Sequence, residues 1–495
     1  MITGSSSDVV VEGGLIPDRS SFTPWDTVRY IWTTLDLPEI ALQSLHLEDG
    51  TPYYQSSFKI SHLAQSSIAL SALSAALIRS LRTGSAVPQV TVPLRHACLE
   101  FQTERLFTIN GQPVASTWGP LGGLHKCSDG YVRIHDSFAN HRHGTLKLLR
   151  LDERANRDDV AVQVAKWKKL ELEEAGYRDK LPIYALRSFD EWDALPQSVA
   201  VSNFPIIIRK ADDLGPKGLP STLQNNGDRC LRGLRVLELS RVIAGPVSGK
   251  TMALHGADVL WVTSPALPDL PSLDMNLSRG KRTIQLDLNH SEDQETLKGL
   301  VKDCDVFIQG YRPESLAARG FGPAELAKLK PGIIYANLSA FGPSGPWSDR
   351  RGFDSLVQTC SGMNVSEAEH SGEGKPAQPT PVQALDHAAG FLLATGISAA
   401  LYKRANEGGS WEVHVSLAGV TKYLRSLRQW PGGRQGFDYA DPALASETLP
   451  EEYLEERDSA FGRMRGLKHA AMIEAAQPGF DFMSKPLGSD KPEWM

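Results

Sequence analysis

The sequence lacks the features that mark several large classes of protein. Its 495 residues include 52 Lys and Arg against 58 Asp and Glu, which gives a net charge of −6, and they contain no long basic run. A nucleic acid is therefore not an expected partner. No uninterrupted apolar run reaches the ~20 residues that a membrane-spanning helix needs. The sequence accordingly predicts no association with a membrane.

Cysteine is scarce as well. The chain has five Cys, an odd number, and no two of them have the Cys-x-x-Cys spacing. This pattern argues against a disulfide framework and a structural zinc site, and it favours a reducing compartment. The first residues, MITGSSSDVVVEGG, show neither the basic and apolar order of a secretory signal nor the arginines of a transit peptide. We therefore expect a cytoplasmic protein that binds no metal.

Residues 231–420 contain what the rest of the chain lacks, a regular alternation of apolar strands and helices. The predicted strands cover residues 234–239, 259–262, 283–288, 305–309 and 333–339. Between them the sequence predicts a helix that ends at Ala257 and helices over 291–302, 314–319 and 323–330. Nearly continuous apolar strands separated by helices indicate an α/β fold, with a Rossmann-like, doubly wound parallel sheet. Such sheets bind ligands at the carboxyl ends of their strands.

A helix–strand unit occurs twice in the chain. Residues 72–84 (ALSAALIRSLRTG) are similar to residues 395–408 (TGISAALYKRANEG), and a short apolar strand follows each of them. An internal repeat of this kind has to be considered before a fold is chosen. Its register places His62 opposite Asp386. Because only the second copy carries a carboxylate there, we expect one working site per chain.

Asp386 is the single carboxylate at the start of an otherwise apolar helix, PVQALDHAAGFLLATGISAALYKR (381–404). An ionised carboxylate there needs stabilisation, which the free N–H groups and the positive end of the helix dipole supply. The residues alone leave two interpretations open. Asp386 is either an N-cap or a nucleophile that the helix terminus orients.

Basic residues recur in the loops beside the predicted strands. Arg241 opens RVIAGP after the first strand, Arg282 ends Gly-Lys-Arg before the third, and Arg312 follows Tyr311 after the fourth. RVIAGP is not a GxGxxG motif, so it gives little support to dinucleotide binding. Several arginines that converge on one sheet edge instead indicate a site for a phosphate-bearing ligand.

These motifs, taken in order, resemble the family III CoA-transferases (the CaiB/BaiF family). The matching run is LRVLELSRVIAGPVSG, GADVLWV, RGKRTIQLDL, DVFIQGYRPESLAARGFG, IIYANLSAFGPSGPW, RRGFDSLVQTCSG and ALDHAAGFLLATGISAALYKRANEGG. The resemblance implies the family III fold, coenzyme A or acyl-CoA as substrate, and no metal. Family members form interlocked dimers, which suggests a homodimer here.

The resemblance also implies roles for individual residues. The aspartate that opens the last helix is the nucleophile of the family, and its match here is Asp386. The residues expected to contact CoA are Arg241, Val242, Ile243, Arg282, Gly310, Tyr311 and Arg312. Phe353 and Asp354 are expected close to the substrate. The chain departs from the family in having Thr263 where many members have Glu, and Gly310-Tyr311 where Asn-Phe is common.

The N-terminal and C-terminal parts resemble other pieces of the same family. The chain therefore resembles a fused, partly degenerate tandem copy. Residues 1–117 would hold the degenerate first-copy helix and strand, 118–202 a smaller α+β domain, and 203–230 a linker with three Pro and three Gly. Residues 231–420 would form the Rossmann-like CoA-binding domain that carries Asp386. Residues 421–495 would form a tail that packs back on the core.

Three functions follow from the resemblance. The first is an acyl-CoA:carboxylate CoA-transferase that works through an aspartyl-acyl anhydride and an aspartyl-CoA thioester, with acyl-CoA and a carboxylic acid as partners. The second is a 2-methylacyl-CoA racemase, which needs a histidine in a Gly-His-Asp element. The matching element here is Gly352-Phe353-Asp354, and phenylalanine carries no proton. The third is a non-catalytic pseudoenzyme, for which His62 in the first copy is a precedent.

Overall fold

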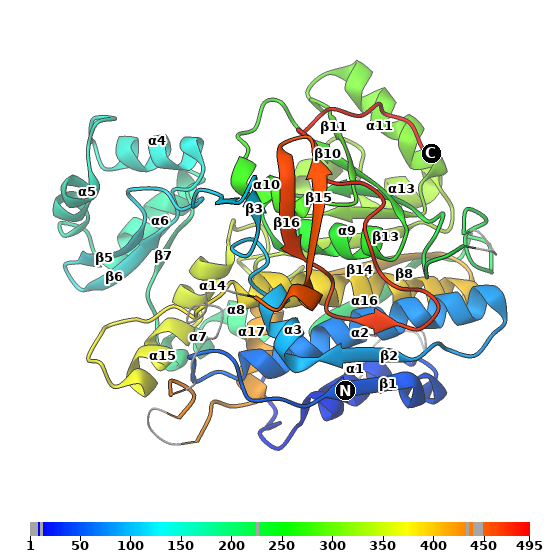
Figure 1. Cartoon of the computed structure of the whole chain (residues 1–495). Helices are drawn as coiled ribbons and strands as arrows, with labels where there is room; N and C mark the ends of the chain where they lie inside the picture. Colours follow the sequence, from blue (N-terminus) through cyan, green and yellow to red (C-terminus); the bar gives the residue numbers. More distant parts are fainter. Residues whose placement is uncertain (1–7, 10–12, 224–226, 432–434, 439–448) are drawn as a thin grey trace.

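The computed structural model describes residues 8–9, 13–223, 227–431, 435–438 and 449–495. A seven-stranded sheet lies at its centre (Figure 1), with the strand order β11-β10-β9-β12-β13-β14-β8. The strands are β8 Ile206–Asp212, β9 Arg235–Leu239, β10 Asp258–Thr263, β11 Arg282–Gln285, β12 Val306–Gln309, β13 Ile334–Ser339 and β14 Ser410–Ser416. Neighbouring strands are parallel, apart from the antiparallel pair β14 and β8 at one edge.

This sheet confirms the predicted α/β class, and its order creates a crevice. From β9 the chain moves outward to β10 and β11 and then returns past β9 to form β12. Helices that connect the two halves therefore lie on opposite sides of the sheet, and the loops after β9 and β12 separate at the carboxyl edge. A ligand site is expected at this point.

Two apolar cores cover the two faces of the sheet. Neighbouring residues on one strand point to opposite faces, so Val236 belongs to the core that includes α9 and α16, and Leu237 to the core that includes α11 and α13. The helices of this region are α9 Ala244–Leu254, α10 Pro271–Leu277, α11 Ser291–Asp303, α12 Pro313–Ala317, α13 Pro323–Leu329, α14 Asp354–Cys360, α15 Met363–Ser371, α16 Ala384–Glu407 and α17 Leu417–Ser426.

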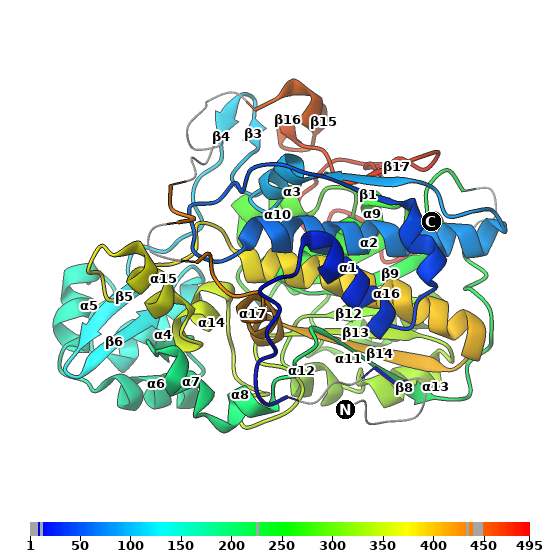
Figure 2. The ribbon, with the colours of Figure 1, turned by 90° about the horizontal axis from the view of Figure 1, so that it is seen from below.

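The helix–strand repeat is present in the structure. The helix α2 (Ile60–Thr83) packs along α16, and Figure 2 shows the two side by side. Both have 24 residues, and His62 and Asp386 are the third residue of each, as the register predicts. By length and composition both helices are apolar enough to cross a membrane, but their most apolar windows are completely buried inside the protein. Their hydrophobicity is explained by this mutual packing.

A small domain lies at one end of the molecule (Figure 1, cyan) and has its own apolar core. Its antiparallel sheet contains β5 Gly123–Cys127, β6 Gly130–Ile134 and β7 Ile183–Ala185. Its helices are α4 Ala139–Leu148, α5 Arg157–Val164 and α6 Lys169–Arg178, and α7 Phe189–Asp193 and α8 Pro196–Ala200 lead back to the large sheet. The predicted linker 203–230 needs a correction here, because its apolar run Ile206–Ile208 pairs with β14 as part of β8.

The ends of the chain complete two smaller sheets. The hairpin β15 Leu454–Ser459 and β16 Gly462–Leu467 extends the pair β3 Thr108–Ile109 and β4 Gln112–Pro113. The strand β17 (Met472–Ile473) joins β2 (Val90–Pro93) and β1 (Leu45–Glu48), with α1 Pro24–Thr34 and α3 Leu94–Glu100 nearby in sequence. Trp494 donates a hydrogen bond from Nε1 to the carbonyl of Leu300 at 3.1 Å. The C-terminal segment thus packs on the core.

Candidate active site

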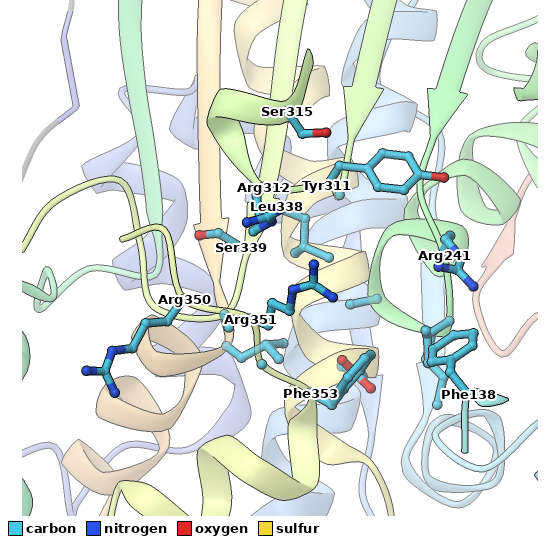
Figure 3. Close-up of a pocket in the computed structure, with 18 of the residues that line it drawn as sticks. Phe138, Arg241, Tyr311, Arg312, Ser315, Leu338, Ser339, Arg350, Arg351 and Phe353 are labelled. Carbon is cyan, nitrogen blue, oxygen red and sulfur yellow. The ribbon is translucent and has the colours of Figure 1, made fainter. Parts of the chain in front are cut away.

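A cavity of about 310 Å³ opens at the carboxyl ends of β9, β12 and β13 (Figure 3), where the strand order reverses. Its walls come from the loop after β9, the loop after β12, the segment 348–353, the start of α16 and the small domain. The small domain contributes Phe138, Asn140 and His141.

Eight of the residues singled out in the sequence line this cavity. They are Arg241, Val242, Ile243, Gly310, Tyr311, Arg312, Phe353 and Asp386. Among them Val242 has a φ of 71°, a left-handed conformation that a β-branched residue rarely adopts. Such backbone strain is typical of loops that a functional site holds in place.

Arg282 does not line the cavity, although the sequence groups it with the CoA-binding residues. Its guanidinium donates to both carboxylate oxygens of Asp258 at 2.8–3.0 Å and to the carbonyl of Glu493 at 2.6 Å. Its neighbour Lys281 is fully buried and lies 2.7 Å from a carboxylate oxygen of Glu238. Both basic groups are therefore used to hold the sheet and the C-terminal segment together.

Asp354 lies beside the site but has a structural partner of its own. Its Oδ2 accepts hydrogen bonds from the backbone N–H groups of Leu385 at 2.8 Å and Asp386 at 3.0 Å. These are first-turn N–H groups of α16, which have no partner within the helix. Burial raises the pKa of Asp354 to about 6, against the lowering effect of these hydrogen bonds. Asp354 thus caps α16, which removes the N-cap interpretation of Asp386.

Asp386 lines the cavity, and its carboxylate takes no part in capping the helix. Its side chain is 7% exposed, and among the described residues no hydrogen-bond donor reaches its carboxylate oxygens. Burial raises the pKa of Asp386 well above its usual range, and the carboxylates of Asp354 and Glu104 act in the same direction. A buried, unpaired carboxylate with a perturbed pKa in a cavity is a candidate for a catalytic group.

His387 does not cooperate with Asp386. Its Nε2 lies 3.0 Å from Oε2 of Glu104, and its ring stacks on Phe101 at a centroid distance of 5.5 Å. Adjacent residues of a helix point in different directions, and His387 does not line the cavity.

Two aromatic contacts join the small domain to the cavity. Phe353 stacks on His135 at a centroid distance of 4.0 Å, and the guanidinium of Arg241 lies 4.2 Å from the ring centre of Phe138. Burial lowers the pKa of His135 to about 3, so this histidine is neutral. These contacts fix the small domain over the carboxyl edge of the sheet.

The sequence analysis missed several residues of the cavity. Arg350 and Arg351 line the cavity, and their position directly before Gly352-Phe353-Asp354 in the sequence could have indicated this. Phe138 and His141 gave no signal, because only the docking of the small domain brings them to the sheet edge.

Comparison with known proteins identifies the central part of the chain. Residues 231–429 match the model of CoA-transferase family III. An acetyl-coenzyme A transferase, nodX, from Hypoxylon pulicicidum is 36% identical over 40% of this chain and 34% of its own length. An acyl-CoA transferase from Gibberella moniliformis is 32% identical over 54% of this chain and 49% of its own. A probable fatty acyl-CoA transferase from Mycobacterium tuberculosis is 32% identical over 41% and 54%, respectively.

The chain thus spans about half or less of the length of these curated relatives. The matched segment contains β9 to α17 and all eight of the cavity residues that the sequence singled out, with Asp386 at the start of α16 among them. The resemblance to CoA-transferase family III therefore extends over residues 231–429, the segment that contains the large-domain side of the cavity.

Proposed function

We propose that the protein is an acyl-CoA:carboxylate CoA-transferase with Asp386 as its nucleophile. The observation that carries the proposal is that Asp354 and Asp386 have different roles at the start of α16. Asp354 accepts the first-turn N–H groups of α16, while the carboxylate of Asp386 faces the cavity without a hydrogen-bonded partner among the described residues. The names of the relatives, which are CoA or acyl-CoA transferases, support the same activity.

CoA would lie along the carboxyl edge of the sheet. Arg241 and Arg312 offer two cations to its phosphates, and the loops around Val242 and Gly310 contribute backbone to the same wall. A second cavity of about 190 Å³ shares Tyr311 with the first and continues past the ends of β10 and β11. This extension offers a place for the nucleotide, and the thioester would reach toward Asp386.

The proposed reaction is a sequence of balanced acyl transfers. The carboxylate of Asp386 attacks the thioester carbonyl, which forms an aspartyl-acyl anhydride and releases CoA thiolate. The thiolate then attacks the aspartyl carbonyl, which gives an aspartyl-CoA thioester and the free donor acid. The carboxylate of the acceptor attacks the aspartyl carbonyl of this thioester, which releases CoA thiolate again and forms a second anhydride. The thiolate then attacks the acceptor carbonyl of that anhydride, which gives the CoA thioester of the acceptor and restores the carboxylate of Asp386. No net proton, metal or redox group takes part.

Each tetrahedral intermediate needs hydrogen-bond donors for its oxyanion. The N–H groups of Leu385, Asp386 and His387 at the start of α16 already donate to Asp354 and Gln383. We therefore place the donors in the loops around the cavity rather than at the helix start.

The racemase alternative receives no support from the cavity. Phe353 occupies the histidine position, and His387 is bonded to Glu104 on the other side of the helix. His141 does line the cavity, but burial, together with the nearby guanidiniums of Arg351 and Arg241, lowers its pKa to about 4. A histidine of that basicity is a poor proton acceptor at neutral pH.

The cytoplasmic location and the homodimer stay predictions. The five cysteines are all buried, and no disulfide joins any two of them, in keeping with a reducing compartment.

The proposal is tested by CoA exchange between acyl-CoA donors and carboxylic acids. Asp386→Asn should lower kcat by at least about 10³-fold, as loss of a nucleophile does, while CoA binding persists. Glu407→Gln neutralises a carboxylate at the far end of the same helix and serves as the matched control. An Asp386→Asn enzyme that retains activity, in a preparation free of deamidated protein, would contradict the proposal.

A further inference from the structure

Arg350 and Arg351 are neighbours in the chain with opposite surroundings. The guanidinium nitrogens of Arg350 lie 3.4 Å from carboxylate oxygens of Glu173 and Glu174 on α6. Its guanidinium also lies 4.3 Å from the ring centre of Tyr177 and 4.5 Å from that of Trp347. Arg350 is thus neutralised and packed against the small domain, and Figure 3 shows it directed away from Arg351.

Arg351 extends into the cavity, as Figure 3 shows, and no carboxylate neutralises it among the described residues. Its Nη1 lies 3.3 Å from Nε2 of His141, and its Nε is buried without a hydrogen-bond partner there. Because burial lowers the pKa of His141 to about 4, the imidazole is neutral and accepts this hydrogen bond. The positive charge of Arg351 is therefore not offset.

The guanidiniums of Arg241, Arg312 and Arg351 all line this cavity, and we call the part that they form its cationic end. Burial lowers the pKa of Arg351, and the guanidiniums of Arg312 and Arg241 lower it further, so three cations face each other. The charges that act on the pKa of Asp386 are instead the carboxylates of Asp354 and Glu104. A substrate that reacts at Asp386 would gain from an anionic group placed at the cationic end.

We propose that Arg351 binds a second carboxylate of the acid substrate, so that the protein acts on dicarboxylic acids and their CoA monothioesters. This inference rests on the proposed function. The planar guanidinium matches a carboxylate with two parallel hydrogen bonds, and His141 holds the guanidinium at its other side. Ile243, Leu338 and Phe353 line the cavity as well, which favours an acid with a carbon chain between its carboxylates.

The phosphates of CoA are the competing source of an anion. The extension proposed for the nucleotide lies past β10 and β11, and its lining does not include Arg351. Arg351 instead adjoins a third cavity of about 260 Å³ on the small-domain side, where Arg178 and Lys180 add two more cations. The cationic end therefore has an approach of its own, which suits a small anionic acid.

The test compares Arg351→Gln with Arg150→Gln, since each variant removes one positive charge and Arg150 is an exposed residue that lines none of the three cavities. Calorimetry would measure the binding of CoA, of the dicarboxylates from oxalate to adipate, and of pentanoate as the monocarboxylate of glutarate's length. We expect Arg351→Gln to weaken the best dicarboxylate by at least about 10-fold, the typical contribution of a charge-assisted hydrogen bond. Binding of CoA and pentanoate should stay unchanged. Arg150→Gln should keep the dicarboxylate affinity within about 3-fold.

Two results would overturn the inference. If no dicarboxylate binds more tightly than pentanoate, or if both acids weaken equally, Arg351 does not select a second carboxylate. If Arg351→Gln weakens CoA instead, the guanidinium binds a phosphate of the nucleotide. Arg351→Lys should recover part of the dicarboxylate affinity. These binding measurements are independent of turnover, so failure of the proposed function would appear separately, as a missing covalent adduct on Asp386.

Discussion

The effect of Asp386→Ala on stability shows whether Asp386 caps α16 or serves only as the nucleophile. Asp354 already binds the first-turn N–H groups of α16. The structure therefore predicts no capping loss in Asp386→Ala. A capping aspartate would instead lose about 0.5–2 kcal/mol at every pH at which it is ionised.

The sign of the pH dependence gives a second, sharper criterion. The pKa of Asp386 is raised well above its usual range by burial and by Asp354 and Glu104. The folded wild type thus holds this proton over a pH range in which the unfolded chain has released it. Its stability falls as the pH rises through that range, by up to about 1.4 kcal/mol per pH unit. Asp386→Ala lacks this fall, so it should gain stability relative to wild type between pH 5 and pH 8.

Amide hydrogen exchange in the peptide 381–404 is the suitable assay, because one global unfolding free energy is not defined for a chain of several domains. Exchange at the start of α16 would be compared in wild type, Asp386→Ala and Asp354→Ala over pH 5–8, after correction for the intrinsic rates. The reasoning predicts faster opening in Asp354→Ala only, since it leaves the N–H groups of Leu385 and Asp386 without an acceptor. A pH-independent loss of protection in Asp386→Ala would refute it.

Three further perturbations test separate parts of the account. Arg312→Ala should weaken CoA binding by about 10-fold or more in calorimetry, and an unchanged affinity would remove Arg312 from the site. Glu104→Gln removes a like charge near Asp386, so the acid limb of kcat/KM should move to lower pH; a limb that stays or moves upward would contradict the assigned influence of Glu104. Lys281→Met leaves the carboxylate of Glu238 buried without its ion-pair partner, which should lower the free energy of local opening around β9 by about 3–5 kcal/mol; hydrogen exchange in the peptide that contains β9 would show this, and Glu238→Gln in the same chain should restore part of the loss.

The central sheet was predictable because its strands are buried on both faces. Continuous apolar runs such as those of β10 and β12 stand out between polar helices, and the structure places both within one or two residues of the predicted bounds. The strand β8 was missed, since its apolar run lies in the segment 203–230 that is rich in proline and glycine. Its partner β14 is about 200 residues further along the chain, and pairing over that separation leaves no local pattern.

The candidate site was predictable where it depends on the sheet. Arg241 and Arg312 follow strand ends directly, so the topology alone brings them to one edge. Arg282 was grouped with them because it lies next to a predicted strand. It is the first residue of β11, however, and it forms an ion pair with Asp258 on the neighbouring strand β10. Asp354 was expected near the substrate, and its binding to the start of α16 depends on a contact over 31 residues. His141 required the docking of a separate domain.

The most direct test of the central claim is the mass of the peptide that contains Asp386 after turnover in the presence of hydroxylamine. Hydroxylamine attacks the aspartyl carbonyl of the anhydride or of the CoA thioester, which leaves a hydroxamate on the protein and releases the acid or CoA. The account predicts this modification at Asp386 alone, in step with loss of activity, and only when an accepted acyl-CoA is present. An enzyme that exchanges CoA between acids while Asp386 stays unmodified would contradict it.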